Sequence, residues 1–428
     1  MNNIKFIPWW HEALTVKPVS ERVLPRETDV VIIGSGYTGL SAALTLSRAG
    51  RSVVVLEAKE LGFGASTRNG GQVGSGNQKF TVQQLIDLYG IEKAKSLVNT
   101  GTEMLSYIET LIEKEKIQCN YKKTGRFRGA VHPKHYDRMA KDLEDLKRFA
   151  GVEFFMVPRS EQHKEVATDY YYGGSVLPND ASLHPGLYHQ GLLERTTAAG
   201  AIVIDYTPVT AIQADKPGFK IQTSRGILKA GDVIVATNGY SGSEIPEFKS
   251  RLVPIGSSII ATEELSEEQI INLMPTGRVY GNTARVFHYY RPSTDGRRLL
   301  FGGREGRLGS QNSYYAFEHL HKEMVRVFPM LHKTKMTHCW SGKIAYTKDT
   351  FPHLGCYNGI WYAAGYCGTG VSRSTWFGHK VALKLLGDPE GKTVFDDLDF
   401  SPFVFRWAAP FGVAMFETWY RIKDAILN

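Results

Sequence analysis

One segment near the start of the chain constrains its fold more than any other. A mostly apolar run over 29–33 leads directly into Gly34-Ser35-Gly36-Tyr37-Thr38-Gly39, and a second run over 53–56 ends at Glu57. This order predicts a strand, a glycine turn, a helix over about 37–49, a second strand and an acidic residue. It is the βαβ pattern of folds that bind a dinucleotide.

The glycines and the acid of this pattern have separate physical roles. Gly34 permits a tight turn, Gly36 lets the backbone approach a pyrophosphate, and Gly39 lets the helix pack closely on the strand. The unpaired N–H groups at the start of the helix then stabilise anionic oxygens. Glu57 would hold a ribose hydroxyl and repel a ribose phosphate, so the pattern predicts an unphosphorylated adenosine half, as in FAD or NAD.

Length and composition favour a globular protein of about two domains. The chain has 428 residues, of which 42% are hydrophobic, and this is more than one core usually holds. The first thirty residues do not have the form of a signal peptide, and we find no apolar run of about 18 residues. Four irregularly spaced cysteines indicate neither a disulfide framework nor a zinc site. We therefore expect a cytoplasmic protein.

The net charge of +8 is compatible with anionic substrates, nucleic acid or an anionic membrane surface, and it selects none of them. No run of five basic residues is present. A short cluster, Lys122, Lys123, Arg126 and Arg128, is interpreted as a solvated strand edge.

The rest of the chain alternates between helical and extended patterns. Apolar residues at three- and four-residue intervals predict helices over 81–148, and another helix is expected over 186–199. Short β-branched runs predict strands at 201–204, 209–213, 219–223, 231–236, 256–262, 286–291 and 298–302, followed by a helix at 315–328. The strand expected at 359–365 leads into a second glycine turn, 365–370, and a helix that continues to Leu386.

Five segments together resemble the D-amino-acid oxidase superfamily of flavoproteins: 29–57, 64–71, 183–209, 233–239 and 340–370. The motif Gly64-Ala65-Ser66-Thr67-Arg68-Asn69-Gly70-Gly71-Gln72 is most similar to the gamma-glutamylputrescine oxidase-like branch. The resemblance implies an α/β (mixed α+β) fold with a glutathione-reductase-type FAD-binding domain, which contains the Rossmann βαβ unit. A substrate domain with a mixed, mainly antiparallel sheet completes it.

The expected domains are interleaved along the chain. The FAD-binding domain is assigned to 1–80, 182–250 and 340–395, and the substrate domain to 81–181 and 251–339. The remaining segment, 396–428, is rich in aromatic residues and is expected to form a helix. We favour packing of this helix on the protein itself or on another subunit, and the alternative is a helix on a membrane surface.

The resemblance also implies which residues bind FAD. Ala65 and Ser66 would lie along the pyrophosphate, and Arg68 to Gln72 would pass the isoalloxazine. Val209 would offer its backbone to adenine, and the second turn would place a helix N-terminus near the flavin pyrimidine ring. The full expected set is Gly34, Gly36, Tyr37, Thr38, Gly39, Glu57, Ala58, Lys59, Gly64, Ala65, Ser66, Arg68, Asn69, Gly70, Gly71, Gln72, Val209, Thr237, Asn238, Gly365, Gly368, Thr369, Gly370 and Val371.

The chemistry implied by the family is the cofactor's own. Hydride leaves the carbon that bears a neutral amine for flavin N5, and the resulting imine hydrolyses, with O2 as the expected final acceptor. The enzyme would thus be an amine or amino-acid oxidoreductase. The thirteen histidines show no HExxH spacing, and we expect no metal site.

Candidate substrate contacts lie on the strand expected at 286–291. Tyr289 and Arg291 are two residues apart and would share one face of that strand. A guanidinium can bind a carboxylate through two parallel hydrogen bonds, so Arg291 suggests an amine that carries an acidic group. His353 is a further candidate, and Trp340, Lys343 and Tyr346 are weaker ones.

Two departures from related flavoproteins bear on the cofactor and on its reoxidation. Where sarcosine-oxidase-like relatives attach flavin through a cysteine, this chain has Ile344-Ala345-Tyr346-Thr347, so we expect noncovalent FAD. Those relatives also carry a lysine near N5 that helps to activate oxygen, and the corresponding strand, 299–304, has none before Arg304. The main alternative is therefore a dehydrogenase that passes electrons to quinone or another carrier. A more remote alternative is an RNA-modifying or nucleic-acid-binding flavoprotein, although no nucleic acid is expected because base-stacking aromatics do not cluster beside basic residues.

Overall fold

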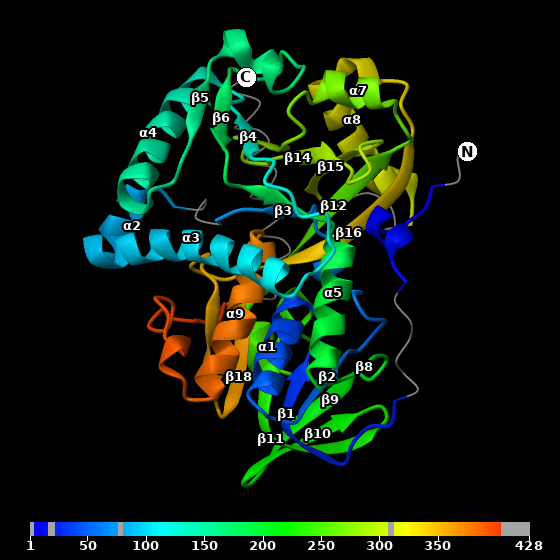
Figure 1. The fold of residues 1–428 in the computed structure, drawn as a ribbon, viewed down its shortest axis with the longest axis vertical. Helices are drawn as coiled ribbons and strands as arrows, with labels where there is room; N and C mark the ends of the chain where they lie inside the picture. Colours follow the sequence, from blue (N-terminus) through cyan, green and yellow to red (C-terminus); the bar gives the residue numbers. More distant parts are fainter. Residues whose placement is uncertain (1–3, 16–21, 76–79, 243, 307–311, 404–428) are drawn as a thin grey trace.

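The computed structural model describes residues 4–15, 22–75, 80–242, 244–306 and 312–403. Two large sheets organise these residues, one in the lower half of Figure 1 and one in the upper half. The chain passes between the two sheets several times, so each is built from segments that are far apart in the sequence. The α/β class expected from the sequence is confirmed.

The lower sheet is centred on the βαβ unit. Its strands follow the order β17 (His353–Tyr357), β18 (Ile360–Ala364), β11 (Gly226–Val235), β1 (Glu27–Ile33), β2 (Val53–Leu56) and β8 (Ile202–Ile204). From β18 to β8 the neighbours run parallel, and β17 is antiparallel at the edge. β9 (Val209–Asp215) and β10 (Gly218–Thr223) extend the sheet from the first half of β11 as an antiparallel meander.

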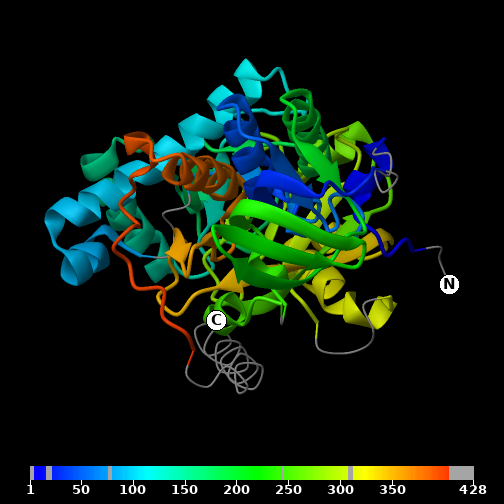
Figure 2. The same ribbon diagram turned by 90° about the horizontal axis from the view of Figure 1, so that it is seen from below.

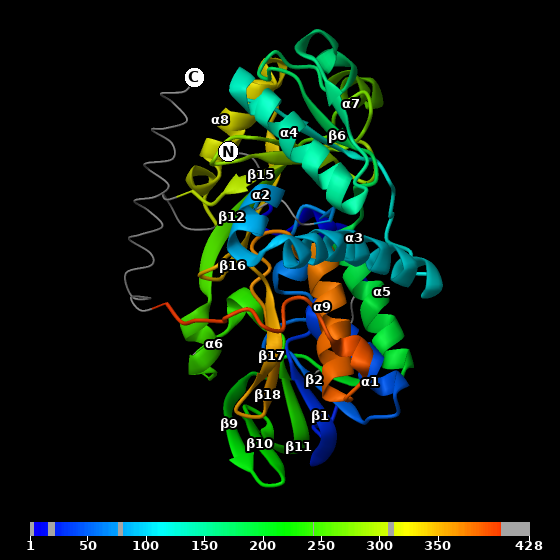
Figure 3. The same cartoon turned by 90° about the vertical axis from the view of Figure 1, so that its left-hand side faces the viewer.

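Both faces of the central strands are buried, which explains their nearly continuous apolar sequence. In β1, Val30 and Ile32 pack with the helices α1 (Tyr37–Arg48), α5 (Pro185–Ala198) and α9 (Gly370–Leu385). Val31 and Ile33 point to the other face and pack with the β9–β11 meander. Figure 2 shows the green meander on one side of the strands and α1 and α9 on the other, and Figure 3 shows the three helices side by side.

The upper sheet is mixed and mainly antiparallel, as expected. Its order is β16 (Met336–Tyr346), β12 (Val253–Thr262), β15 (Leu299–Arg304), β14 (Tyr289–Pro292), β13 (Val279–Asn282), β4 (Arg126–Gly129), β6 (Gly174–Leu177) and β5 (Phe155–Val157). β13 and β4 are parallel to each other. α7 (Glu267–Leu273) and α8 (Glu318–Val327) lie at the right of this sheet in Figure 1, and α4 (Pro133–Ala150) lies at the left.

The two faces of the upper sheet differ sharply in character. One row of paired residues is aromatic, and within it the rings of Tyr280, Tyr290 and Phe301 stack at centroid distances of 5.2 and 5.6 Å. The next row, which points to the opposite face, is Gly302, Tyr289, Gly281, Arg128 and Ser175. The aromatic row packs against α8 in one hydrophobic core. The second row faces the lower half of the molecule.

Several sequence expectations need correction at the level of individual elements. The region 81–148 contains α2 (Val82–Tyr89), α3 (Ile91–Lys114) and α4, but β4 interrupts it. β4 is an interior strand between β13 and β6, so the arginines of that cluster do not lie on a solvated strand edge. The expected boundary at residue 340 falls within β16, and the division into domains stays a prediction.

Among the described residues, no helix is long and apolar enough to cross a membrane. Most of the expected C-terminal aromatic helix, residues 404–428, lies outside the described part of the chain.

Candidate functional site

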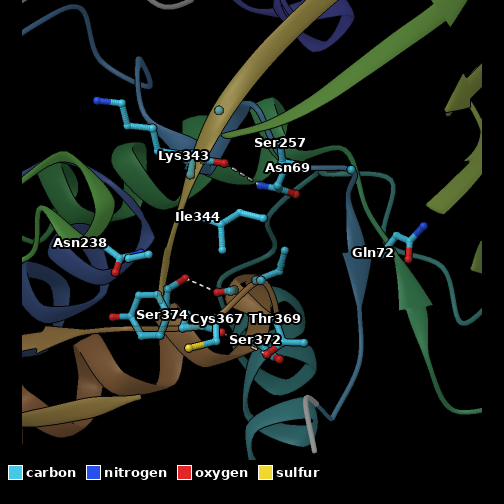
Figure 4. A pocket seen from close by; sticks show the side chains of 18 of the residues that line it. Asn69, Gln72, Asn238, Ser257, Lys343, Ile344, Cys367, Thr369, Ser372 and Ser374 are labelled. Atoms are coloured by element: carbon cyan, nitrogen blue, oxygen red, sulfur yellow. Dashed lines mark hydrogen bonds between the residues drawn. The ribbon is translucent and has the colours of Figure 1, made fainter. Parts of the chain in front are cut away.

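A cavity of about 890 Å³ opens between the two sheets and is lined from both. The lower sheet contributes the turns that follow β1, β2, β11 and β18, and the upper sheet contributes the row that carries Tyr289, Gly281, Arg128 and Ser175. The carboxyl ends of parallel strands meet at this edge, which is where α/β sheets bind ligands. Figure 4 gives a close view of the part beside β16 and α9.

The first glycine turn has the geometry that its sequence predicts. Gly34 has φ +103°, and a Cβ on Gly39 would lie 1.9 Å from the carbonyl oxygen of Gly34. A Cβ on Gly36 would lie 2.9 Å from Oγ of Ser66. The same Oγ accepts a hydrogen bond of 3.0 Å from the backbone N–H of Tyr37, at the start of α1. The turn is therefore closely packed on its inner side while its N–H groups border the cavity.

Glu57 lies at the end of β2, and three hydrogen bonds fix its carboxylate. Oε2 accepts from the backbone N–H of Ser35 at 3.1 Å and from its hydroxyl at 2.8 Å. Oε1 accepts from the backbone N–H of Lys59 at 3.1 Å. The carboxylate nevertheless borders the cavity, so it combines a fixed position with remaining acceptor capacity. This is the arrangement that a ribose hydroxyl requires.

The segment 64–72 is held by its own side chains and by β16 of the upper sheet. Asn69 donates to the carbonyls of Ala65 and Ser66 at 3.1 and 2.9 Å, and its Oδ1 accepts from the N–H of Gly71 at 2.9 Å. Arg68 donates to the carbonyls of Phe63 and Ser341, at 2.6 and 3.2 Å, so its guanidinium helps to hold the loop. The indole N–H of Trp340 donates to the carbonyl oxygen of Arg68 at 2.9 Å.

The second glycine turn lies next to the first one. The hydroxyls of Thr38 and Tyr366 are 2.7 Å apart, and the side-chain oxygen of Asn238 accepts from the N–H of Gly365 at 2.9 Å. A Cβ on Gly378 would lie 2.3 Å from the carbonyl oxygen of Thr38, so α9 packs directly on α1. The N-termini of both helices therefore border one cavity. Figure 4 shows Thr369, Ser372 and Ser374 gathered at the start of α9 beside Cys367.

The structure brings most of the expected cofactor residues to the cavity wall. Those that line it are Gly34, Gly36, Tyr37, Thr38, Glu57, Ala58, Lys59, Gly64, Ala65, Ser66, Arg68, Asn69, Gly70, Gln72, Val209, Thr237, Asn238, Gly368, Thr369, Gly370 and Val371. The other three, Gly39, Gly71 and Gly365, lie behind the wall, where an added Cβ would come within 2.3 Å of another atom. A cavity with two helix N-termini, a fixed carboxylate and closely packed glycines fits an extended dinucleotide such as FAD.

The three expected substrate residues have different positions. Tyr289 lines the cavity, its ring lies against Gly70, and burial raises its pKa to about 12. Arg291 does not line the cavity, because its buried guanidinium donates to the carbonyls of Gly71, Leu183 and Pro292 at 2.9 to 3.0 Å. This geometry does not support the expected anion clamp.

His353 also differs from the expectation. It is buried, bonded to Asp349 at 3.0 Å and stacked on Phe400, and it is not part of the cavity wall. Of the weaker candidates, Lys343 borders the cavity through its position on β16, but Figure 4 shows its side chain leaving the strand on the opposite side from Ile344.

Sequence reasoning missed the arm of the cavity between β4 and α4. Arg128 of β4 and residues of α4 line this arm, the latter at helical intervals: His135, Arg138, Met139, Asp142, Leu143 and Leu146. The available signal was the alternation Arg126-Phe127-Arg128, which places both arginines on one face of a strand with a buried Phe127 on the other. Cys367 was missed as well, and its thiol donates to the carbonyl of Gly365 at 3.2 Å.

The comparisons with known proteins agree with this geometry. Residues 29–383 match the model of the family described as FAD dependent oxidoreductase (DAO). The chain is 33% identical to the "Probable oxidoreductase OrdL" of Haemophilus influenzae over 86% of this chain and 85% of that protein. It is 32% identical to the "Gamma-glutamylputrescine oxidoreductase" of Escherichia coli over 93% of each chain.

Solved structures share the fold at low sequence identity. Glycine oxidase from Geobacillus kaustophilus superposes with a TM-score of 0.74 at 20% identity, covering 89% of this chain and 99% of the other. L-Proline dehydrogenase from P. horikoshii gives a TM-score of 0.72, also at 20% identity, covering 87% and 96%. The fold, the cavity and the family match together establish that this chain belongs to the DAO family of FAD-dependent oxidoreductases.

Proposed function

We propose that this chain binds FAD noncovalently and oxidises the C–N bond of an amine or amino acid. The observation that carries the proposal is that one cavity joins the two glycine turns to the upper sheet. A cofactor held by the turns and a substrate held by the sheet would then meet in one partly closed space. The relatives support the substrate class, because their names specify gamma-glutamylputrescine, glycine and L-proline.

The proposed roles of the residues follow from their positions. Glu57 would hold the ribose, the N–H groups at the start of α1 together with Ser66 would hold the pyrophosphate, and Val209 would border the adenine. The segment 68–72 and the second turn would border the flavin ring. When bound, FAD supplies the acceptor for a hydride from the carbon next to the amine nitrogen, and water then hydrolyses the imine.

The protein's own contribution is position and electrostatics. The dipole of α9 favours negative charge at its N-terminus, where reduced flavin carries it. Asn69 and Arg291 fix the backbone of 69–71, so this wall of the cavity needs little reorganisation during the reaction. Tyr289 offers an aromatic face whose hydroxyl stays protonated at neutral pH because burial raises its pKa to about 12.

The final electron acceptor is proposed to be O2, with a quinone or another carrier as the second candidate. One observation supports the second candidate, the small number of lysines in the cavity wall. Within the described chain these are Lys59, beside Glu57, and Lys343. β15 contributes no lysine. A fixed cation stabilises the superoxide that forms when O2 takes the first electron. Parallel assays of peroxide formation and of dye-linked quinone reduction separate the two candidates.

The central experiment is anaerobic flavin reduction. Purified protein is expected to be yellow, and a panel of amines and amino acids is mixed with it without oxygen while the flavin absorbance is followed. Bleaching by at least one amine supports the proposal. A protein that cannot be reconstituted with FAD would overturn the cofactor assignment, and a flavoprotein reduced by no amine in the panel would overturn the reaction.

A further inference from the structure

The cavity has a second arm, remote from the glycine turns, whose chemistry the proposed reaction leaves unused. It runs over the upper sheet from Tyr289 across Gly281 to Arg128, three residues that are neighbours on adjacent strands. Arg128 is thus two strand spacings, ~10 Å, from Tyr289. Ser175 continues the row beyond Arg128, and α4 covers it.

Arg128 differs from its basic neighbours because its guanidinium forms no hydrogen bond or ion pair with the described residues. Arg126 is paired with Asp180 at 2.9 Å, and Arg138 with Asp142 at 3.7 Å. The side chain of Arg128 is accessible to solvent, yet burial lowers its pKa, with Arg126 as the next cause. Both statements hold because the solvent that reaches this side chain is inside the cavity. The negative charge of Asp142 on α4 opposes this lowering of the pKa, but its carboxylate is paired with Arg138. A cation without a direct partner in such a place gains strongly from an anionic ligand.

Gly281 keeps the path to Arg128 open. A Cβ on this residue would meet a single neighbouring atom within 4 Å, the carbonyl oxygen of His288 at 3.6 Å. By contrast, the ring of Tyr289 covers Gly302, at 2.4 Å from the position of a Cβ, on the other side of the row. The missing side chain at Gly281 leaves room for a ligand chain to cross β13. The walls beyond it include the apolar side chains of Met139 and Leu143, which suit methylene groups.

We propose that Arg128 binds the carboxylate of a substrate whose reacting amine lies beyond Gly281, on the Tyr289 side. The ligand class is an amine that carries a carboxylate at the far end of a flexible chain. This inference rests on the proposed function and deepens it. Arg128 thereby replaces Arg291 as the residue that binds the acidic group of the substrate, because the Arg291 guanidinium donates to three backbone carbonyls. A planar guanidinium can take both carboxylate oxygens at once, and this fixes the distance between the two ends of the substrate.

The test uses the FAD-loaded full chain and omega-amino acids from aminobutanoate to aminooctanoate, with n-alkylamines of equal length as matched controls. Binding is measured by calorimetry and by the change in flavin absorbance without oxygen. At least one amino acid of the series is expected to bind more tightly than its alkylamine. R128M should lose about tenfold or more of that affinity while its alkylamine affinity stays unchanged.

Two further variants make the result specific. R138M removes the same charge from an exposed side chain of the same arm and should change the affinity much less than R128M does. Gly281→Val should weaken the long amino acids and spare the shortest amines, because it narrows the path without meeting the backbone closely. Thermal melting of each variant checks that it is folded.

Equal affinity of wild type and R128M for every amino acid, or no amino acid that binds better than its alkylamine, would overturn the inference. Flavin bleaching by alkylamines with no effect of R128M would reject the Arg128 site and leave the proposed function intact. Arg128-dependent binding by calorimetry without bleaching by any amine would do the reverse.

Discussion

The hydroxyl of Tyr289 lies 3.0 Å from Oγ of Ser257, which in turn donates to the carbonyl oxygen of Gly303 at 2.9 Å. Because the single hydroxyl proton of Ser257 is used for Gly303, Tyr289 is the donor in this pair. A tyrosine that donates has to be protonated, and burial raises its pKa to about 12. These two hydrogen bonds therefore link the cavity wall to β15, and they require Tyr289 to be protonated.

The first prediction concerns this pair. Tyr289→Phe keeps the ring against Gly70 and removes the donated bond, so the free energy of unfolding should fall by about 1 kcal/mol. The alkaline limb of the pH profile of kcat/KM should be the same in wild type and variant, because the tyrosine does not ionise in that range. Ser257→Ala and the double variant complete a cycle. A shifted alkaline limb in Tyr289→Phe would show that the hydroxyl takes part in proton transfer.

The second prediction concerns Arg291. Arg291→Met leaves the carbonyls of Gly71, Leu183 and Pro292 without their donor, so unfolding should become easier by about 3 kcal/mol or more. R128M is the matched control, because the Arg128 side chain forms no hydrogen bond within the described chain, and the melting temperature of this variant should change little. Chemical denaturation of both variants measures the difference. Equal stability of the two would contradict the backbone-holding role.

The third prediction tests the first glycine turn. Gly39→Ala would place a methyl group 1.9 Å from the carbonyl oxygen of Gly34, so the turn has to shift and the purified protein should lose its flavin. Gly239→Ala is the control, because Gly239 does not line the cavity and its added methyl group has the backbone N of Ala345 at 3.4 Å as its nearest neighbour. Flavin content per chain after gel filtration gives the answer. Full flavin retention in Gly39→Ala would place the pyrophosphate elsewhere.

The fourth prediction concerns the attachment of FAD. Cys339 does not line the cavity, and burial raises the pKa of its thiol to about 12, so it is a poor nucleophile. Cys367 lines the cavity but donates its thiol proton to Gly365. Acid precipitation should therefore release all the flavin into the supernatant. A yellow pellet in wild type that becomes colourless in Cys367→Ser would identify a covalent bond.

The fifth prediction is a pH effect on stability. His184 caps α5 through Nδ1, which accepts from the N–H of Leu187 at 3.1 Å, and burial followed by the charge of Arg291 lowers its pKa from 6.5 to about 4. The unfolded chain takes up a proton below pH 6.5 that the folded chain refuses until about pH 4, so acid lowers stability across this window. The loss is at most about 1.4 kcal/mol per pH unit.

His184→Asn keeps a side-chain cap acceptor and removes the titration. Its free energy of unfolding should therefore fall less than that of wild type between neutral pH and the acid end of the window. Denaturant titrations at several pH values measure the two slopes. Parallel slopes would assign the acid sensitivity to other groups, of which the buried His189 is the first to examine.

The parts of the fold that could be predicted are those determined by short sequence patterns. The turn at Gly34 to Gly39 is recognisable because its glycines have a fixed spacing between two apolar runs, and Glu57 ends the second run. Gly39 meets the carbonyl of Gly34 within the same turn, whereas Gly34 and Gly36 face the distant residues Ala236 and Ser66. The second turn could be predicted because its glycines also follow an apolar run and precede a helical pattern. In the upper sheet, the segments predicted at 256–262, 286–291 and 298–302 correspond to β12, β14 and β15, and the other five of its eight strands were not predicted.

The parts that the sequence did not predict depend on distant partners. β4 has four residues, two of them arginines, and it is a strand because β13 and β6 lie on its two sides. Arg291 has the right residue type for a carboxylate, but the fold places three backbone carbonyls in its reach. Whether an arginine such as Arg128 has an ion-pair partner depends on how several distant segments pack. A local sequence pattern therefore does not predict it.

The cavity wall includes two turns that lie far apart in the sequence, and this bears on the order of events during synthesis. β1 and its turn are synthesised well before β18 and α9, which complete the cavity wall. A nascent chain that ends before residue 360 lacks the second helix N-terminus that borders the site. A complete site for the flavin therefore requires that α9 has been synthesised and has packed on α1.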